Sequence, residues 1–340
     1  MSRRRVAIVG CGLIGAKRAA ALSAQDHLLA CHDIDPQAGE RLAEQFRCGA
    51  CATFEDLLEL SPDVVIVATP HDQLAGLAEL ALAAGAHVLV EKPAGLSSAQ
   101  VDRLIECQRA SGQMVKVGFN HRFHPGIARA AEEVHSGRHG ELMHLRGRYG
   151  HGGRLGYERE WRAQPERSGG GELIDQGMHL LDLTHWLAGP LRLHAALLRT
   201  QFWDMPAEDN AALILGDARS RSDPWAMLHV SWTEWKNLFS LEIYCRTAKM
   251  QVDGLARSYG PQRLRIYLMG PELGPPELEE LNYPDEDRSW EQEWRSFARA
   301  IDAGDARLLN GDLLDARYAW EQVEAAYADG PYAAMRQAIA

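Results

Sequence analysis

Long apolar runs are missing from this sequence, and so is any excess of positive charge. No stretch reaches the roughly 18 consecutive apolar residues that a transmembrane helix needs, which excludes a membrane span of that kind. The 340 residues carry a formal net charge of −11, so the basic footprint of a nucleic-acid-binding protein is absent as well. We therefore expect neither a membrane nor a nucleic acid as partner.

A disulfide framework is also missing. The six cysteines are scattered, at Cys11, Cys31, Cys48, Cys51, Cys107 and Cys245. Cys48-Gly49-Ala50-Cys51 is a C-x-x-C pair, which is compatible with a redox site or with half of a zinc site. A zinc site needs a second pair of ligands at similar spacing, and the sequence has none. We interpret the pair as incidental thiols in a reducing compartment.

The N-terminal residues have two interpretations. Arg3-Arg4-Arg5 followed by VAIVGCGLIGA could be an export signal of the twin-arginine type. However, that apolar stretch contains a glycine motif that cleavage downstream would remove. We therefore expect a cytoplasmic protein.

The first third of the chain has the pattern of a nucleotide-binding turn. VAIVG (6–10) is typical of a short strand, and a helical pattern follows the segment Gly10-Cys11-Gly12-Leu13-Ile14-Gly15. In a strand–turn–helix context the first glycine allows the tight turn, the second lets the backbone approach a pyrophosphate, and the third permits close helix packing. The amides at the helix N-terminus would bind the phosphates. Gly10, Gly12, Leu13, Ile14 and Gly15 are candidate cofactor contacts.

Asp33 ends the next predicted strand, LLACHDID (28–35), 18 residues beyond Gly15. A carboxylate at this place accepts hydrogen bonds from the ribose hydroxyls of NAD and repels the 2′-phosphate of NADP. The alternative is an acidic strand-end residue that starts the turn before Pro36. Together with the glycines, Asp33 favours NAD over NADP.

Strands and helices then alternate, which predicts a doubly wound parallel sheet. The expected strands are 62–70, 87–93 and 114–123, and the expected helices are 73–85 and 98–112. Ligands of such sheets bind beyond the carboxyl ends of the strands. On this edge we expect cofactor contacts from Thr69, Pro70, His71, Glu91, Lys92 and Asn120. Lys92 is also compatible with an ordinary solvated surface charge.

GELIDQGMHLLDLTHWLAGP (171–190) predicts a mostly buried amphipathic helix with an unusual polar face, preceded by a flexible Gly169-Gly170-Gly171. Asp175, His179, Asp182 and Trp186 recur at i, i+4, i+7 and i+11, which aligns them along one side. Asp175 and His179 are compatible with a structural hydrogen-bonded pair. A metal site would add His185, which lies about 80° off this face, so we expect no metal. We interpret Asp182 as a supporting or capping residue and Trp186 as a packing residue.

GCGLIG, ATPH, EKP, VGFNHRFHP and GGGELIDQGMHLLDL together resemble the glucose–fructose oxidoreductase/inositol dehydrogenase/MocA (Gfo/Idh/MocA) family of NAD(P)-dependent enzymes. The resemblance follows chain order over essentially the whole sequence. It implies α/β architecture: a Rossmann domain (1–123), then a domain with a large, open, mostly antiparallel sheet (124–340), whose C-terminal helices could pack on the first domain. It also implies a homodimer or homotetramer.

The resemblance further implies roles for single residues. Lys92 of EKP matches the catalytic lysine of the family, Asp175 and His179 match its acid and histidine, and Arg122 matches a residue near the substrate. The sequence pattern of the second half agrees with this fold. Apolar and polar residues alternate in 225–232 and 238–245, which is typical of strands, and 287–302 and 313–328 have helical patterns.

The segment RYGHGGRLGYEREWR (148–162) is glycine-rich, basic and aromatic, which suits a loop over a hydroxyl-rich or anionic ligand. Tyr157, Trp161 and Arg162 are our candidate substrate contacts there, and a plain solvated loop is the alternative.

These observations lead to one principal hypothesis, an NAD-dependent dehydrogenase that oxidises a secondary alcohol of a sugar, cyclitol or nucleotide-linked sugar. His179 would remove the hydroxyl proton, Asp175 would assist it, and Lys92 would stabilise the alkoxide. The alternatives are a glycoside hydrolase that recycles NAD in place and a non-catalytic NAD-binding sensor.

Overall fold

The computed structural model describes residues 3–272 and 274–339, which divide into two compact units. The first unit comprises the chain up to Asn120 together with Trp290–Arg317, and the second comprises His121–Ser289 and the chain from Tyr318. The division lies three residues before the predicted boundary at 123/124. The segment 290–317, which the prediction left in the second domain, is grouped with the first unit, so that unit is discontinuous in sequence.

The first unit contains a six-stranded parallel sheet of order β3-β2-β1-β4-β5-β6. This order, with crossovers on either side of β1, confirms the predicted doubly wound topology. The strands are β1 Arg4–Val9, β2 Asp26–His32, β3 Gly49–Ala50, β4 Val64–Val67, β5 His87–Val90 and β6 Val115–Val117.

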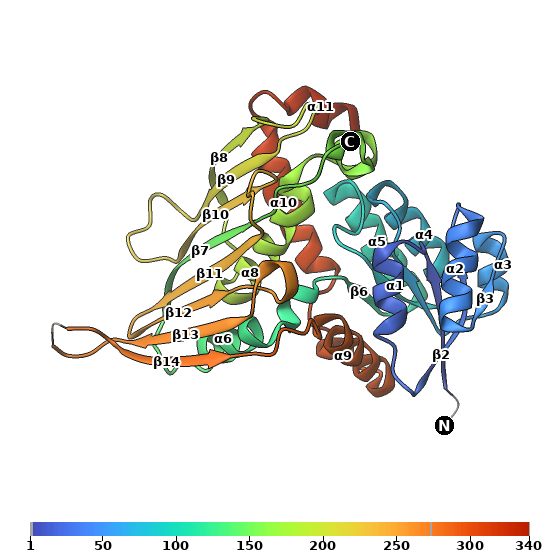
Figure 1. The fold of residues 1–340 in the computed structure, drawn as a ribbon, viewed down its shortest axis with the longest axis horizontal. Coiled ribbons are helices and arrows are strands. Elements are labelled where there is room, and N and C mark those ends of the chain that lie inside the picture. Colours follow the sequence, from blue (N-terminus) through green and yellow to red (C-terminus); the bar gives the residue numbers. More distant parts are fainter. Residues whose placement is uncertain (1–2, 273, 340) are drawn as a thin grey trace. The chain divides into compact units, whose positions relative to one another are not determined.

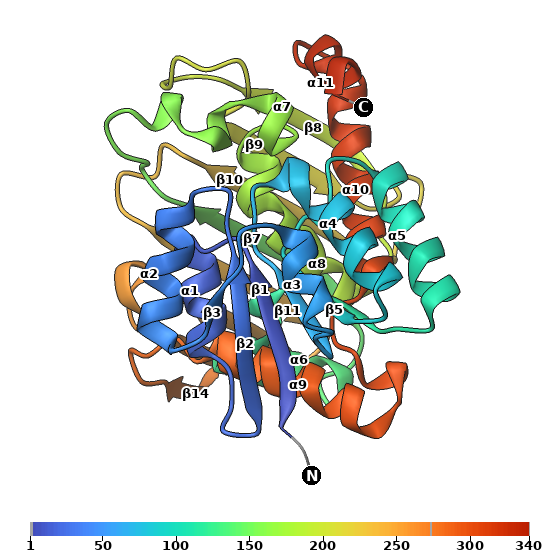
Figure 2. The ribbon, with the colours of Figure 1, turned by 90° about the vertical axis from the view of Figure 1, so that its right-hand side faces the viewer.

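Helices cover both faces of this sheet (Figure 2), α1 and α2 on one side and α4 and α5 on the other. The helices are α1 Leu13–Ala20, α2 Pro36–Phe46, α3 Phe54–Glu59, α4 His71–Ala83, α5 Ser98–Ser111 and α9 Ser289–Ala303, with a short 3₁₀ helix at Ala306–Leu308. Local capping explains where several begin. The Asp35 side chain accepts from the Gln37 N–H at the start of α2, and Thr53 and Asp56 form a reciprocal capping box on α3.

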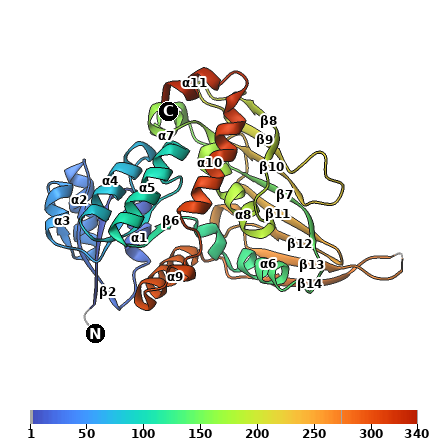
Figure 3. The same cartoon turned by 180° about the vertical axis from the view of Figure 1, so that it is seen from behind.

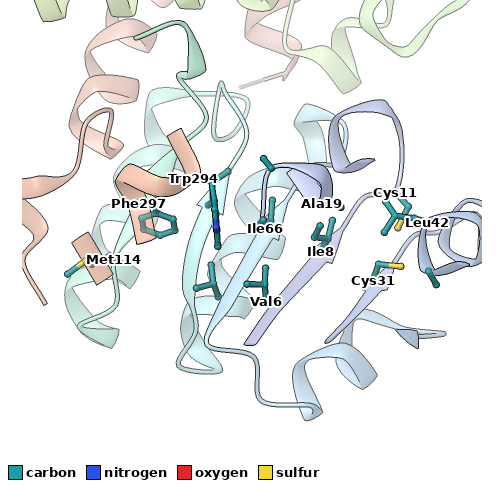
Figure 4. Packing of buried hydrophobic residues seen from close by; sticks show 14 of the residues in the cluster. Val6, Ile8, Cys11, Ala19, Cys31, Leu42, Ile66, Met114, Trp294 and Phe297 are labelled. Atoms are coloured by element: carbon teal, nitrogen blue, oxygen red, sulfur yellow. The ribbon is translucent and has the colours of Figure 1, made fainter. Parts of the chain in front are cut away.

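The core of the first unit draws on both of its chain segments (Figure 4). Val6, Ile8 and Ile66 of the central strands are fully buried and cluster with Trp294 and Phe297 of α9. The parallel strands are buried on both faces, which is why their sequences are almost continuously apolar.

A buried ion network adds a second link between these segments. Arg18 of α1 donates from Nε to Oε1 of Glu91 and from Nη1 to Oε2 of Glu293, both at 2.5 Å. Lys116 of β6 donates to Oε1 of Glu293 at 2.8 Å. Burial raises the pKa of Glu91, against the charge of Arg18. At Glu293 burial acts in the same sense, but Lys116 and Arg18 outweigh it and lower the pKa. The network therefore joins the glycine-turn helix, the strand end before Lys92, and α9.

The second unit contains an eight-stranded mixed sheet of order β14-β13-β12-β11-β7-β10-β9-β8. Only β7 and β10 pair in parallel, and every other neighbouring pair is antiparallel. This confirms the predicted open, mostly antiparallel sheet. Its strands are β7 Leu142–Gly150, β8 Leu193–Arg199, β9 Asn210–Leu215, β10 Trp225–Ser231, β11 Leu238–Cys245, β12 Ala248–Asp253, β13 Arg263–Leu268 and β14 Glu277–Asn282.

Figures 1 and 3 show α6 (Pro125–His135) and α8 (Met178–Ala188) along one face of this sheet. The other face exposes apolar side chains, including those of Leu197, Trp225 and Met227. The remaining α-helices are α7 Pro165–Ser168, α10 Leu313–Ala328, whose first residues are grouped with the first unit, and α11 Ala333–Ile339, and 3₁₀ helices occur at Asn120–Phe123, Tyr157–Arg159, Trp161–Ala163 and Arg257–Tyr259. Over the part of the chain that the structure describes, no helix has both the length and the apolar character to cross a bilayer.

Three expectations from the sequence were wrong in detail. The strand predicted at 114–123 ends at Val117, and Asn120–Phe123 forms a 3₁₀ helix. The helix predicted at 171–190 begins with a π-helical turn at Leu173–Gly177, and α8 follows it. The segment predicted as one loop at 148–162 begins inside β7 and ends in two 3₁₀ helices.

Candidate active site

The glycine turn of the first unit has the shape of a phosphate cradle. Gly10 has a φ of +91°, which is strained for other residues, and a Cβ on Gly15 would lie 1.9 Å from the carbonyl oxygen of Gly10. A Cβ on Gly12 would meet nothing within 4 Å, so this side of the turn is open. Gly12 caps α1 without a side-chain hydrogen bond, and the first turn, which starts at Leu13 and Ile14, has no acid. Its amides can therefore donate to an anion.

Asp33 is held beside this turn by the backbone. Its Oδ2 accepts from the Cys11 N–H at 2.7 Å, and its Oδ1 accepts from the Asp35 N–H at 2.9 Å. Ile34, the next residue, is 89% exposed. The carboxylate thus has a fixed position at the end of β2, next to the cradle, with no arginine at the adjoining position.

The other predicted cofactor contacts of the first unit follow the ends of neighbouring parallel strands. Thr69 and Pro70 come after β4, and the buried His71 begins α4. The Thr69 hydroxyl oxygen is buried and has no hydrogen-bond partner among the described residues. Half-buried Lys92 follows β5 directly after Glu91, while Asn120 is buried beyond β6. The Glu91 carboxylate accepts a hydrogen bond from Arg18. The predicted contact of Glu91 with the cofactor stays a prediction.

In the second unit, Asp175 lies on the π-helical turn. From Ser168 to Thr184 every residue is buried except Asp175, whose side chain is 16% exposed. Arg162 approaches it with Nε 3.4 Å from Oδ2, and the Arg162 guanidinium lies over the Trp161 ring at 4.5 Å. Wider π turns often occur at functional sites. Three predicted residues are therefore brought together here: Trp161, Arg162 and Asp175.

His179, at the start of α8, stacks on a second histidine. The ring centroids of His179 and His121 are 3.8 Å apart with planes inclined by 22°, and both residues are about 5% exposed. Tyr149 of β7 packs against both, at 5.1 Å from His121 and 6.3 Å from His179. His121 and Tyr149 were missed as site residues, although each lies in a quoted motif, NHRF and RYG.

A second tyrosine, Tyr259, packs next to Tyr149 in this group of rings. The ring centroids of Tyr149 and Tyr259 are 5.4 Å apart, and Nε2 of Gln176 donates to the Tyr259 oxygen at 3.1 Å. Burial raises the pKa of Tyr259 to about 12 and that of Tyr149 well above its ordinary value, with the charge of Asp175 contributing to both. Both phenols therefore stay protonated. Nothing in the sequence near Tyr259 signalled this position.

Tyr157 occupies a cluster of aromatic side chains rather than an exposed loop. It is 4% exposed and packs against Trp203 and Trp232, with ring centroids at 5.6 and 5.0 Å. Its hydroxyl is buried without a hydrogen-bond partner among the described residues. Burial raises its pKa, and the charge of Asp175 adds to the shift, so the phenol stays protonated.

Arg122 is engaged in a buried, two-point ion pair. Its Nε and Nη2 donate to the two carboxylate oxygens of Asp182 at 2.9 and 2.6 Å, and its guanidinium lies over the Trp186 ring at 5.3 Å. Asp182 and Trp186 thus support α8 against the 3₁₀ helix at 120–123. The predicted substrate contact of Arg122 stays a prediction, since its Nε and Nη2 already donate to Asp182.

The described residues contain no evident set of side chains that could bind a metal ion. Over residues 3–272 and 274–339, no group of three or more His, Cys, Asp or Glu side chains is arranged to hold a metal ion. Asp182, one member of the alternative ligand set, is bound by Arg122.

Two family models match consecutive parts of the chain. The model GFO_IDH_MocA, "Oxidoreductase family, NAD-binding Rossmann fold", matches residues 4–119, and the "GFO/IDH/MocA C-terminal domain" matches residues 127–251. Together they reach into both units and take in well over half of the sequence.

Curated relatives match about half of the chain. It is 33% identical over 170 residues to 1-carboxy-3-chloro-3,4-dihydroxycyclohexa-1,5-diene dehydrogenase of Comamonas testosteroni, which covers 47% of this chain and 41% of that protein. It is 31% identical over 194 residues to D-glucoside 3-dehydrogenase of Escherichia coli (strain K12), covering 54% of each. The chain thus spans about half the length of these relatives.

Solved structures match over nearly the full length. Levoglucosan dehydrogenase in complex with NADH and levoglucosan superposes with a TM-score of 0.83 and 18% identity, covering 95% of this chain and 97% of that one. At this identity the likeness establishes the fold alone.

Proposed function

Because this chain belongs to the Gfo/Idh/MocA oxidoreductase family, we propose that it is an NAD-dependent dehydrogenase of secondary alcohols. The observation that carries the proposal is the grouping in the second unit of an arginine-bound acid, Asp175, and a histidine, His179, at one end of a buried helix. A buried helix does not need these two groups for packing, whereas removing a proton from an alcohol needs a base.

The first unit fits a dinucleotide cofactor. The open side of Gly12 and the uncapped amides of α1 suit a pyrophosphate, and the anchored Asp33 carboxylate suits ribose hydroxyls. The fixed negative charge favours NAD over NADP. Thr69, His71, Lys92 and Asn120 are the further contacts we assign at the strand ends.

The chemical roles follow from the groups present. NAD, when bound, supplies the hydride acceptor. His179 takes the hydroxyl proton as the carbinol hydrogen leaves as hydride, and Asp175 orients the hydroxyl or the imidazole. Lys92 contributes a positive charge that stabilises the developing alkoxide. Arg162, whose Nε lies 3.4 Å from Oδ2 of Asp175, holds that side chain in place.

We assign the substrate to the sugars, cyclitols and nucleotide-linked sugars. The names of relatives support this class, as D-glucoside 3-dehydrogenase and inositol 2-dehydrogenase both act on ring-bound secondary alcohols. In this chain Trp161 offers an aromatic face and Arg162 a cation beside Asp175, and Tyr157 has a buried phenol hydroxyl without a hydrogen-bond partner among the described residues. These groups suit a hydroxyl-rich ring.

We also assign a homodimer or homotetramer. The sheet face opposite α6 and α8 exposes Leu197 on β8 and Trp225 and Met227 on β10, two strands separated by β9. Such exposed apolar side chains are the kind of surface that subunits bury. Light scattering on the purified protein gives the oligomer mass, and a monomeric mass at micromolar concentration contradicts this part of the proposal.

The decisive experiment follows NAD reduction at the nicotinamide absorbance, with a panel of free sugars, inositols and nucleotide sugars. Wild type is compared with His179→Ala and with His185→Ala, a histidine of the same helix that stacks on Tyr318 instead. We expect turnover of one class, loss of at least about 100-fold in His179→Ala, and little change in the control. Rates should rise with pH as His179 loses its proton. Hydrolysis without net NADH would favour the glycosidase alternative, and tight NADH binding without turnover would favour the sensor.

A further inference from the structure

The glycines that precede the π-helical turn are enclosed by other side chains. A Cβ on Gly170 would lie 2.4 Å from the Tyr327 hydroxyl oxygen. A Cβ on Gly171 would lie 2.0 Å from the carbonyl oxygen of Glu208 and 2.7 Å from its carboxyl carbon. Because backbone and a buried carboxyl cannot move aside, only glycine fits at 171. Gly170 and Gly171 pack tightly against Tyr327 and Glu208. The prediction that the glycine segment 169–171 is flexible was therefore wrong.

Glu208 and Tyr327 satisfy the start of the turn with hydrogen bonds. The Glu208 carboxylate accepts from the Leu173 N–H at 3.0 Å, and the Glu208 carbonyl accepts from the Glu172 N–H at 3.0 Å. The Tyr327 hydroxyl donates to Oε2 of Glu208 at 2.6 Å, and its oxygen accepts from the Gly171 N–H at 3.2 Å. The first amides of a helical segment have no partner within it, so these two residues act together as its cap.

We propose that Glu208 and Tyr327, which we name the turn clamp, are positioning residues for Asp175 and His179. This inference rests on the proposed function. The turn starts at Leu173, two residues before Asp175, and passes into α8 at Met178, one residue before His179. The clamp fixes where the first turn begins, and hence the angular offset between the acid and the histidine. Without it, the segment can return to ordinary α-helical spacing, which changes that offset.

The charges around the clamp come from several elements. Glu172 immediately precedes the turn, and Asp209 follows Glu208 in the chain. Tyr332 hydrogen-bonds Thr200 at 2.7 Å, and Arg336 of α11 donates to the Gly169 carbonyl at 3.2 Å. The variants below leave all of these side chains in place.

Tyr327→Phe is the test, with Tyr318→Phe as its matched control. Tyr318 lies on the same helix, α10, and its hydroxyl makes the same kind of bonds, to the Leu191 carbonyl at 2.6 Å and from the Leu191 N–H at 3.1 Å. That bond anchors the chain after α8 and not before it. At about pH 8 we expect kcat for alcohol oxidation to fall at least about tenfold in Tyr327→Phe, with KM for NAD unchanged and the control near wild type.

Two readouts are independent of turnover. Amide hydrogen exchange at Gly171 and Leu173 should speed up in Tyr327→Phe and not in Tyr318→Phe. The NMR titration midpoint of His179 should shift in the same variant only. If wild type oxidises no alcohol, the proposed function fails, and the His179 shift still supports the clamp.

Faster exchange with unchanged kcat and an unchanged His179 midpoint would overturn the proposal. Equal losses in both tyrosine variants would do the same. If Tyr327→Phe does not fold, Glu208→Gln replaces it, because the amide keeps the side-chain shape and one oxygen acceptor. If that variant also fails to fold while the control folds, the clamp is structural only and the proposal is overturned.

Discussion

Glu293→Gln should destabilise the first unit by about 3–5 kcal/mol, because removing one member of a buried ion pair leaves its partner charged and desolvated. The Glu293 carboxylate binds Arg18 at 2.5 Å and Lys116 at 2.8 Å, and all three side chains are at most 1% exposed. The amide keeps the volume, so packing is unchanged. Glu291→Gln is the control: on the same helix, Glu291 pairs with Arg295 at the surface, and such pairs contribute about 0.5 kcal/mol or less.

Urea unfolding and calorimetry measure both variants. The melting temperature of the first unit should fall by roughly 10 °C in Glu293→Gln and barely in the control. The pH dependence has a definite sign. Since Lys116 and Arg18 lower the pKa of Glu293, its stabilisation is present above the ordinary value of 4.5 and is lost as pH falls through the lowered value. The gap between wild type and variant should therefore narrow below about pH 4.5. A gap no larger than that of Glu291→Gln, or one independent of pH, would refute this reasoning.

Three further outcomes follow from single contacts. Asp33→Asn, which removes a charge fixed by the Cys11 N–H, should raise the ratio of NADPH to NADH affinity about tenfold in fluorescence titrations, most clearly at low salt; an unchanged ratio would remove Asp33 from cofactor selection. Gly171→Ala should cost about 3 kcal/mol or more in urea unfolding, because its Cβ overlaps Glu208, whereas Gly76→Ala, with nothing within 4 Å, should be neutral or stabilising. Burial raises the pKa of Glu208 to about 7, so its ionisation destabilises the fold progressively between pH 4.5 and 7; Glu208→Gln should gain roughly 3 kcal/mol relative to wild type across that range, and parallel stability curves would contradict this.

Local patterns predicted the fold, and they also singled out the glycine turn and the Asp175–His179 segment as parts of a candidate site. The spacing of Gly10, Gly12 and Gly15 after an apolar run indicated the phosphate turn, and the structure has that turn between β1 and α1. The i, i+4 relation of Asp175 and His179 placed them near each other, since they are neighbours in sequence. These features depend on contacts within one or two turns of chain, which a single sequence displays directly.

Contacts between segments that are distant in the chain could not be predicted from the sequence. Glu208 and Tyr327 lie 119 residues apart, and Arg18 and Glu293 lie 275 apart. No local periodicity encodes such pairs. The glycines at 169–171 suggested flexibility because glycine permits it, but at Gly171 the residue is needed for lack of space. The π-helical turn was missed for the same reason, since its cap comes from elsewhere in the chain.

The discontinuity of the first unit has a consequence for biosynthesis. Trp294 and Phe297 belong to the same core as Val6 and Ile8, so a ribosome that has released only the first 120 residues has released a nucleotide-binding sheet without part of its interior. The second unit lacks only its last helices at the moment when α9 emerges. We therefore expect the nascent sheet to stay protease-sensitive until residues 290–317 have left the exit tunnel. Pulse proteolysis of stalled chains of increasing length would detect that late step, and early protection of a 120-residue chain would contradict it.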